Sequence, residues 1–246
     1  MRLTDLSYVF RRYEEKYLLT AEQYAAFFGA VRPRLCPDEF GKSTVMSVYL
    51  DTPSFRIIRA SLDARDYKEK LRVRCYGQPR GDSTAFFELK KKFDGIVYKR
   101  RAAMTLEQAE RFILTAEPPE ASQIAEELAW SLRFYGMPRA SMLICCEREA
   151  FFLDGEDDVR ITFDTGVRYR RENADPRRGP DGKRLLPEGT VLAEIKTPGA
   201  MPLFLASELD RAGIRPVSFS KYGIAYRDFL ALSDTNTIFP GGHFHV

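Results

Sequence analysis

The stretch Leu71-Arg72-Val73-Arg74-Cys75 alternates apolar and basic residues without a break. The stretches Phe87-Glu88-Leu89-Lys90 and Ala193-Glu194-Ile195-Lys196 alternate in the same way, with a carboxylate two residues before a lysine. Because side chains on a β-strand point alternately to its two faces, each stretch is predicted to be a strand with one charged and one apolar face. Related stretches at residues 12–16, 98–101 and 160–164 show charged residues with the same spacing.

Several two-faced strands in one chain favour a β-barrel whose charged face points inward and whose apolar face is covered by helices. The predicted class is α+β, with about eight strands and flanking α-helices. Asp94-Gly95 predicts a tight hairpin, Pro202 is predicted at the first position of a helix, and the polar segment 172–189 is predicted to be a mobile loop. Strands are expected at 8–19, 45–50, 68–76, 85–93, 96–103, 142–153, 159–171 and 191–197. Helices are expected at 20–31, 54–62, 105–116, 123–135 and 202–211.

The composition is that of a protein with an apolar core and an unusual amount of charge. The 246 residues are 44% hydrophobic and 30% charged, against a usual charged share of about 25%. The net charge is only +3, so an anion site has to come from the arrangement of charges. The chain is expected to form one domain, to lie in the cytoplasm and not to insert into a membrane. Buried free thiols are expected at Cys36, Cys75, Cys145 and Cys146.

Common catalytic and nucleotide-binding motifs are missing from the sequence. The two histidines, His243 and His245, lie in the last four residues, and there is no G-x-S-x-G motif. There is also no Walker lysine loop and no G-x-G-x-x-G. Phosphate would therefore have to be bound by lysine and arginine side chains, which suit phosphate oxygens.

The paired carboxylates and lysines suggest a metal-dependent phosphate site. Mg²⁺ and Mn²⁺ need only one or two carboxylates together with substrate phosphates. Taken one pair at a time, Glu88/Lys90 and Glu194/Lys196 are better explained as ion pairs on a solvated face. Like charges lined up at Arg72/Arg74 and Lys99/Arg101 are unfavourable unless an anion neutralises them, which favours the phosphate site.

The chain resembles the VTC domain, the catalytic domain of the vacuolar transporter chaperone complex, in the triphosphate tunnel metalloenzyme (CYTH-like) superfamily. The resemblance covers about residues 10–229, leaving a C-terminal tail at 233–246. It implies a single tunnel domain, 1–246, built as an eight-stranded antiparallel β-barrel. It rests on the order and spacing of seven stretches: Glu14-Glu15-Lys16, Val48-Tyr49-Leu50-Asp51-Thr52, Leu71-Arg72-Val73-Arg74-Cys75-Tyr76-Gly77, Phe87-Glu88-Leu89-Lys90, Glu147-Arg148-Glu149, Ala193-Glu194-Ile195-Lys196 and Phe219-Ser220-Lys221-Tyr222-Gly223.

The resemblance implies a polymerase that transfers the terminal phosphate of ATP to inorganic polyphosphate, with Mn²⁺ or Mg²⁺ as cofactor. Glu194 matches the metal-ligating glutamate, and Glu14 is either a second ligand or a partner for Arg12. Ser218 stands where eukaryotic members carry a lysine. The residues expected to grip the triphosphate are Lys16, Arg72, Arg74, Lys90, Arg148 and Lys196. The residues expected to guide the acceptor chain are Lys99, Arg101 and Lys221.

Other functions are compatible with the same residues. A tunnel of this kind could hydrolyse a triphosphate, or it could bind polyphosphate or nucleotide without catalysis. Nucleic acid is not an expected partner, because the aromatic residues are predicted on the outer face rather than on a stacking platform. An exposed charged sheet with no ligand is the remaining interpretation.

Overall fold

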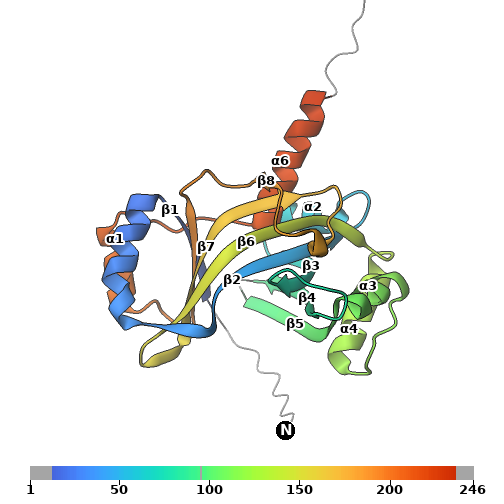
Figure 1. Cartoon of the computed structure of the whole chain (residues 1–246), viewed down its shortest axis with the longest axis horizontal. Helices are drawn as coiled ribbons and strands as arrows, with labels where there is room; N and C mark the ends of the chain where they lie inside the picture. The colour runs from blue at the N-terminus through green and yellow to red at the C-terminus, as the bar shows by residue number, and fades with distance from the viewer. Residues whose placement is uncertain (1–12, 95, 237–246) are drawn as a thin grey trace, which may run out of the picture.

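The computed structural model describes residues 13–94 and 96–236, and in them one large antiparallel sheet carries six α-helices (Figure 1). Eight strands follow one another in the order β1-β9-β7-β6-β2-β3-β4-β5, and β8 pairs with β7. The strands are β1 (Tyr13–Leu19), β2 (Leu35–Asp51), β3 (Tyr67–Tyr76), β4 (Thr84–Phe93), β5 (Ile96–Thr105), β6 (Arg139–Leu153), β7 (Glu156–Arg170), β8 (Lys183–Arg184) and β9 (Val191–Thr197). The helices are α1 (Ala21–Val31), α2 (Arg56–Asp63), α3 (Leu106–Thr115), α4 (Gln123–Phe134), α5 (Leu203–Arg211) and α6 (Lys221–Asn236), with 3₁₀ turns at Arg32–Arg34 and Pro176–Arg178.

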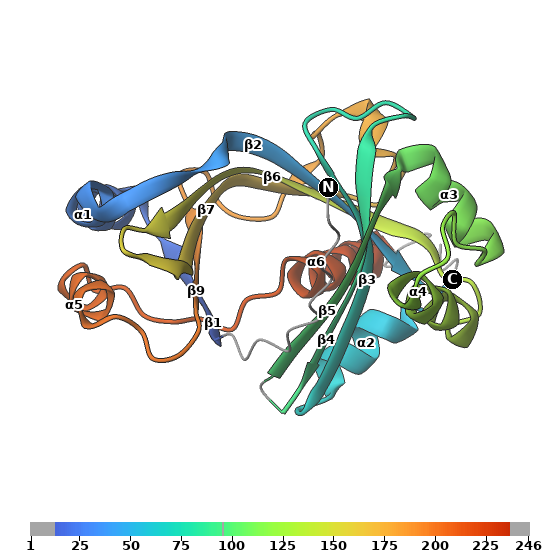
Figure 2. The ribbon, with the colours of Figure 1, turned by 90° about the horizontal axis from the view of Figure 1, so that it is seen from below.

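The sheet curves into a trough, and closure into a barrel is not detected among the described residues. In Figure 2 the strands β1 and β9 form one arm of the trough and β3, β4 and β5 form the other. The outer edge of β1 is occupied by the segment that precedes α6, because Val217 N donates to Lys16 O at 2.7 Å and Pro216 forms a bridge with Tyr17. This contact occupies backbone groups of β1 that β5 would need in order to pair with it. The predicted closure of the barrel by pairing of β1 with β5 is therefore not found among the described residues.

The apolar outer face of the sheet is covered by helices, as the alternation predicts. On the β3–β4 side, Leu71, Val73 and Phe87 pack against Phe112 of α3 and Leu128 of α4. On the β1–β9 side, strand residues pack in the same way against α1 and α5. The charged faces of these strands are consequently turned toward the inside of the trough.

Helix α6 was not predicted from the sequence, and it packs on the concave face instead of the outer one. Its Tyr222 and Tyr226 join Tyr49 of β2 and Ile144 of β6 in a third apolar cluster. Figure 1 shows α6 at one end of the trough, running away from the sheet, and Figure 2 shows it nearly end-on between the two arms. Residues 233–236, predicted as tail, belong to this helix.

Several predicted boundaries need correction. Strand β2 begins at Leu35 rather than at residue 45, because a register break between Pro37 and Lys42 accommodates the proline and Gly41 inside the strand. Pro202 is the N-cap of α5 and not its first helical residue. Of the strand predicted at 8–19, residues 8–12 lie outside the described part of the chain, as do His243 and His245.

The segment 172–189, predicted to be one loop, contains the strand β8, which pairs with β7, and its Leu185 and Leu186 pack in the apolar cluster beside α6. The first part of the segment lies on the other side, toward α3. Arg170 donates to the carbonyl oxygens of Asn173, Asp175 and Gly179, which ties the segment to the end of β7. Arg177 in this segment forms an ion pair with Glu110 of α3. These contacts direct this first part of the segment toward α3.

The cysteines only partly match the expectation of buried free thiols. All four are free, and Cys75, Cys145 and Cys146 are buried. Cys36 is exposed; it lies near the start of β2, where it alternates with the buried Leu35.

Candidate functional site: a basic cavity inside the trough

The concave face of the sheet encloses a cavity of about 560 Å³. Ten lysine and arginine side chains line it among the described residues, against three carboxylates. The excess of positive charge here is larger than the net charge of +3 for the whole chain. Every residue predicted for the site lines this cavity except Arg101: Glu14, Lys16, Arg72, Arg74, Lys90, Lys99, Arg148, Glu194, Lys196 and Lys221.

Three lysines lie side by side on neighbouring strands. Lys70 of β3 is directly opposite Lys90 of β4, and Lys90 is directly opposite Lys99 of β5. Like charges at directly opposed positions destabilise a sheet. The row is therefore an arrangement that a bound polyanion would relieve.

Glu88 is the carboxylate that organises the β4 wall of the site. Its side chain is fully buried and accepts from Arg72 Nε at 2.7 Å and Arg101 Nε at 2.7 Å, while Lys99 Nζ lies 2.7 Å from Oε1. Burial alone would raise the pKa of Glu88, but Arg72, Arg74 and Lys99 hold it well below its usual range. Arg101 thus belongs to the site through Glu88, although it does not line the cavity.

Asp164 of β7 is a second buried carboxylate, and it pairs with cations on the opposite wall of the site. It accepts two bonds from Arg148, at 2.6 and 2.7 Å, and one from Lys221, the first residue of α6. Burial opposes ionisation, yet Lys221 and Arg148 keep the pKa of Asp164 well below its usual value. Lys221 and Arg101, predicted to act together, therefore pair with different carboxylates on different strands.

Two cations of the cavity form no ion pair with any carboxylate in the described part of the chain. Arg74 Nε donates to Ser47 Oγ at 3.3 Å, and Lys70 Nζ donates to Ser220 Oγ at 2.8 Å. Burial and the neighbouring Arg72 lower the pKa of Arg74. Burial, with repulsion from Lys90 among others, lowers the pKa of Lys70 to about 8. Of the cations that line the cavity, these two side chains would therefore gain most from contact with a bound anion.

The candidate metal ligands, Glu14 and Glu194, lie on the adjacent strands β1 and β9. Lys16 contacts both carboxylates, Lys90 lies 2.9 Å from Glu14, and Lys196 lies 2.6 Å from Glu194. Burial and the charge of Glu194 would raise the pKa of Glu14, but the three lysines lower it to about 2. The pKa of Glu194 is also held well below its usual value, against burial, by the same lysines. Both groups are therefore ionised at neutral pH.

This donor set fits Mg²⁺ or Mn²⁺ sharing its coordination with phosphate oxygens. Two ionised carboxylates suffice for such an ion when the substrate supplies further oxygen ligands. Thr162 is directly opposite Glu194 in the sheet, and its buried hydroxyl has no hydrogen-bond partner among the described residues. No cluster of three or more His, Cys, Asp or Glu side chains occurs in the described part of the chain. Arg12, the alternative partner proposed for Glu14, lies outside it.

Sequence reasoning missed several residues that line the cavity. Lys70 lies two positions before Arg72, so the alternation that identified Arg72 could have identified it as well. Arg160 lies in a stretch with the right spacing and could also have been found. Tyr49 lies on the cavity-facing side of β2, two residues after Ser47, whereas Ser220 reaches the cavity because it directly precedes α6, a helix for which the sequence has no comparable signal.

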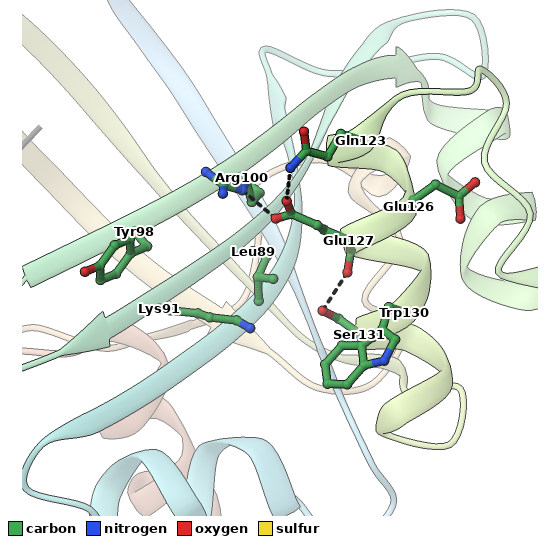
Figure 3. Close-up of a pocket in the computed structure, with 9 residues that line it drawn as sticks. All are labelled: Leu89, Lys91, Tyr98, Arg100, Gln123, Glu126, Glu127, Trp130 and Ser131. Carbon is green, nitrogen blue, oxygen red and sulfur yellow. Dashed lines mark hydrogen bonds and ion pairs between the residues drawn. The ribbon is translucent and has the colours of Figure 1, made fainter. Parts of the chain in front are cut away.

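A second pocket lies outside the trough, between α4 and the outer faces of β4 and β5 (Figure 3). Arg100 in this pocket is neutralised by Glu127 at 2.5 Å, and Glu126 adds a further negative charge. Trp130 and Lys91 form its far side. The two cations that line this pocket among the described residues, Lys91 and Arg100, are matched by the two carboxylates Glu126 and Glu127, so it offers no excess positive charge to a polyphosphate and the trough remains the candidate site.

The fold and the site together define an α+β domain whose curved antiparallel sheet encloses a cation-lined cavity with inward carboxylates. The family model of the VTC domain matches residues 11–230, and the chain therefore belongs to the VTC domain family. A comparison with curated protein sequences gives no significant match.

Two solved structures support the fold assignment. A Bacillus halodurans protein described as a candidate adenylate cyclase superposes with a TM-score of 0.52 at 12% identity, covering 85% of this chain and 95% of its own. A Hippeastrum candidate adenylyl cyclase, described as having a dominant triphosphatase activity, superposes with a TM-score of 0.51 at 13% identity, covering 94% of this chain and 99% of its own. Identities this low establish a shared fold. No helix in the described part of the chain is long and apolar enough to span a membrane.

Proposed function

We propose that the protein is a metal-dependent polyphosphate polymerase. The terminal phosphate oxygen of a polyphosphate chain would attack the γ-phosphorus of ATP, and the bond between the γ-phosphorus and its bridging oxygen to the β-phosphorus would break. The products are ADP and a chain longer by one phosphate. Membership of the VTC domain family and the cation-lined cavity support this proposal.

The carboxylates at the cavity are poor candidates for a general base that would activate water. A general base works best when its pKa lies near the working pH. The pKa values of Glu14, Glu194 and Asp164 are all lowered far from neutrality by their cationic partners. Water would need a base of its own, whereas a terminal phosphate oxygen is already ionised. Lys70 and Lys99, whose pKa values are lowered to about 8 and about 7, could still take a proton from water, so it is membership of the VTC domain family that supports the choice of polymerase over hydrolase.

The protein groups would act by positioning and by neutralising charge, which is most of what phosphoryl transfer requires. The cations on the two walls would grip the triphosphate from both sides, with Lys70 added to the predicted set. Glu194 and Glu14 would hold Mn²⁺ or Mg²⁺, which when bound withdraws charge from phosphate oxygens. Lys99, Arg101 and Lys221 would contact the acceptor or the ends of the bound chain.

The test is incubation of the purified protein with ATP and Mn²⁺, with products resolved on a gel and ADP and free phosphate measured. Long phosphate chains with matching ADP would support the polymerase. Free phosphate without chains would replace it with a triphosphatase, and binding without turnover would leave a polyphosphate-binding module.

Glu194→Gln is the matching variant, because it removes the charge and keeps the shape. We expect metal-dependent turnover to fall to background while the circular dichroism spectrum is unchanged. Glu188→Gln, a change at an exposed glutamate whose ion pair is with Arg184, should retain full activity. Full activity of Glu194→Gln would rule out its role as a metal ligand.

A further inference from the structure

Three aromatic rings stand together just beyond the cavity, on Phe40, Tyr76 and Phe86. The rings of Phe40 and Tyr76 are 6.4 Å apart between centroids and nearly parallel, with 13° between their planes. Tyr76 meets Phe86 edge-on at 6.0 Å. Phe40 and Tyr76 keep 67% and 41% of their surface exposed. We call these three residues the aromatic rim.

The rim lies on the concave side of the sheet, at the end of the trough opposite α6. Tyr76 follows Arg72 and Arg74 on the same face of β3, and Phe86 precedes Glu88 on the same face of β4. Lys70, which contacts Ser220 at the start of α6, lies six residues before Tyr76, or about 20 Å along the strand. The expectation that the aromatic residues lie only on the outer face is therefore wrong for this rim.

The backbone brings Phe40 to this place by a local irregularity. The register of β2 against β6 breaks between Pro37 and Lys42, and Gly41 in this break has a positive φ of 54°. Such bulges redirect side chains. Asp38 accepts from the backbone N–H of Phe40 at 3.1 Å and from Arg160 of the cavity wall at 2.8 Å, which fixes the bulge to the mouth of the cavity.

Arg101 connects the rim with the phosphate-binding wall. Its guanidinium lies 4.3 Å from the ring centroid of Phe86 and 3.5 Å from the hydroxyl of Tyr76. The same guanidinium is paired with Glu88 beside Arg72. The separation between Arg74 and Tyr76, two residues or about 7 Å along β3, leaves room for a sugar between a phosphate and a stacked base.

We propose that the aromatic rim binds the nucleobase of the nucleoside triphosphate whose phosphates occupy the cavity. This inference rests on the proposed function and assigns the nucleoside to the end of the trough away from α6. Aromatic rings with open faces stack on any base, so the site selects for a base and not for a particular one. At the α6 end, Tyr49 and Tyr222 stack on each other at 4.5 Å and are buried, so they offer no open face.

The experiment compares a ligand with a base and one without. Isothermal titration calorimetry is done with β,γ-imido-ATP and with inorganic tripolyphosphate, on the wild type and on Phe40→Ala, Phe40→Trp and Phe93→Ala. Phe40→Ala should weaken the ATP analogue about five- to a hundred-fold, the range for loss of a base-stacking ring. Its affinity for tripolyphosphate should not change, and Phe40→Trp should bind the analogue at least as well as the wild type. Phe93, 54% exposed at the far end of β4, is the matched control and should have no effect.

The outcomes separate this inference from the proposed function. Equal affinities of Phe40→Ala and wild type for the analogue would overturn the nucleobase site while leaving the phosphate site intact. A parallel loss for both ligands would overturn it too, because the ring would then act on the cavity and not on the base. If the wild type bound neither ligand, the proposed function itself would fail.

Discussion

Arg72 and Arg74 are predicted to respond differently to the same substitution. They lie two residues apart on the same face of β3, but Arg72 is paired with the fully buried Glu88, whereas Arg74 contacts Ser47 Oγ and forms no ion pair with a described carboxylate. Methionine keeps most of the aliphatic stem and removes the charge. The two variants therefore isolate the effect of the carboxylate partner.

The expected effect on stability follows from these contacts. Breaking a buried ion pair costs about 3 to 5 kcal/mol when the other charge is left behind. Lys99 and Arg101 remain on Glu88 in Arg72→Met, so we expect the lower end, about 3 kcal/mol. Arg74→Met removes a cation that is repelled by Arg72 and Arg148 but attracted by Glu88 without direct contact, so these effects oppose one another. We expect its unfolding free energy to stay within about 1 kcal/mol of the wild type.

Phosphate binding should show no such contrast. Each arginine would contribute a charge-assisted hydrogen bond worth roughly 1.5 to 3 kcal/mol, which is about a ten- to hundred-fold loss of tripolyphosphate affinity in either variant. Urea unfolding gives the stabilities, and calorimetry at two salt concentrations gives the affinities. Equal destabilisation of both variants would refute the reasoning, because Arg74 would then have a stabilising partner in the absence of anion.

Two further predictions concern titration and the opposite wall. Burial lowers the pKa of Lys99 to about 7 despite the opposing charge of Glu88. Lys99 therefore loses most of its positive charge as the pH rises from about 6 to about 8, and tripolyphosphate affinity should fall over that range. Lys99→Arg should flatten this fall, Lys183→Arg outside the cavity should not, and an unchanged slope in Lys99→Arg would contradict the assignment. Asp164→Asn leaves the largely buried Arg148 and Lys221 without their carboxylate and should lower the unfolding free energy by about 3 kcal/mol. Saturating tripolyphosphate should then raise the melting temperature of Asp164→Asn more than that of the wild type, and an equal rise would argue against anion binding at this wall.

Most of the cavity wall could be predicted from the sequence because strand geometry has only two faces. Once Arg72 is placed inside, Arg74 must follow it, and Glu88 and Lys90 behave alike on β4. The same rule would have found Lys70. What alternation cannot provide is the partner across the trough, since contacts such as Lys90 with Glu14 depend on how the sheet curves.

Whether the trough closes into a barrel could not be predicted from the sequence either. Alternating strands predict a barrel, but whether the last two edges meet depends on what else can occupy them. Here Val217 takes the edge of β1, and Ser220 reaches Lys70 on the other arm. Helix α6 then places its aromatic residues on the concave face. A helix on the concave face does not follow the two-residue period of the strands, and it does not cover the apolar outer face as the other helices do. The sequence pattern therefore did not predict it.

The charge distribution of the cavity is costly for an unliganded protein. Lys70, Lys90 and Lys99 face one another, and Arg74 is buried with no carboxylate of its own among the described residues. Glu88 and Asp164 neutralise only part of this charge, and each does so at a burial cost. A ligand that binds only the folded state adds its binding energy to the stability, so a polyanion would compensate for the repulsion. Apolar replacements on these strands would suit a sheet selected for stability alone, and their absence here is the physical argument for our proposal that the cavity holds a polyanion.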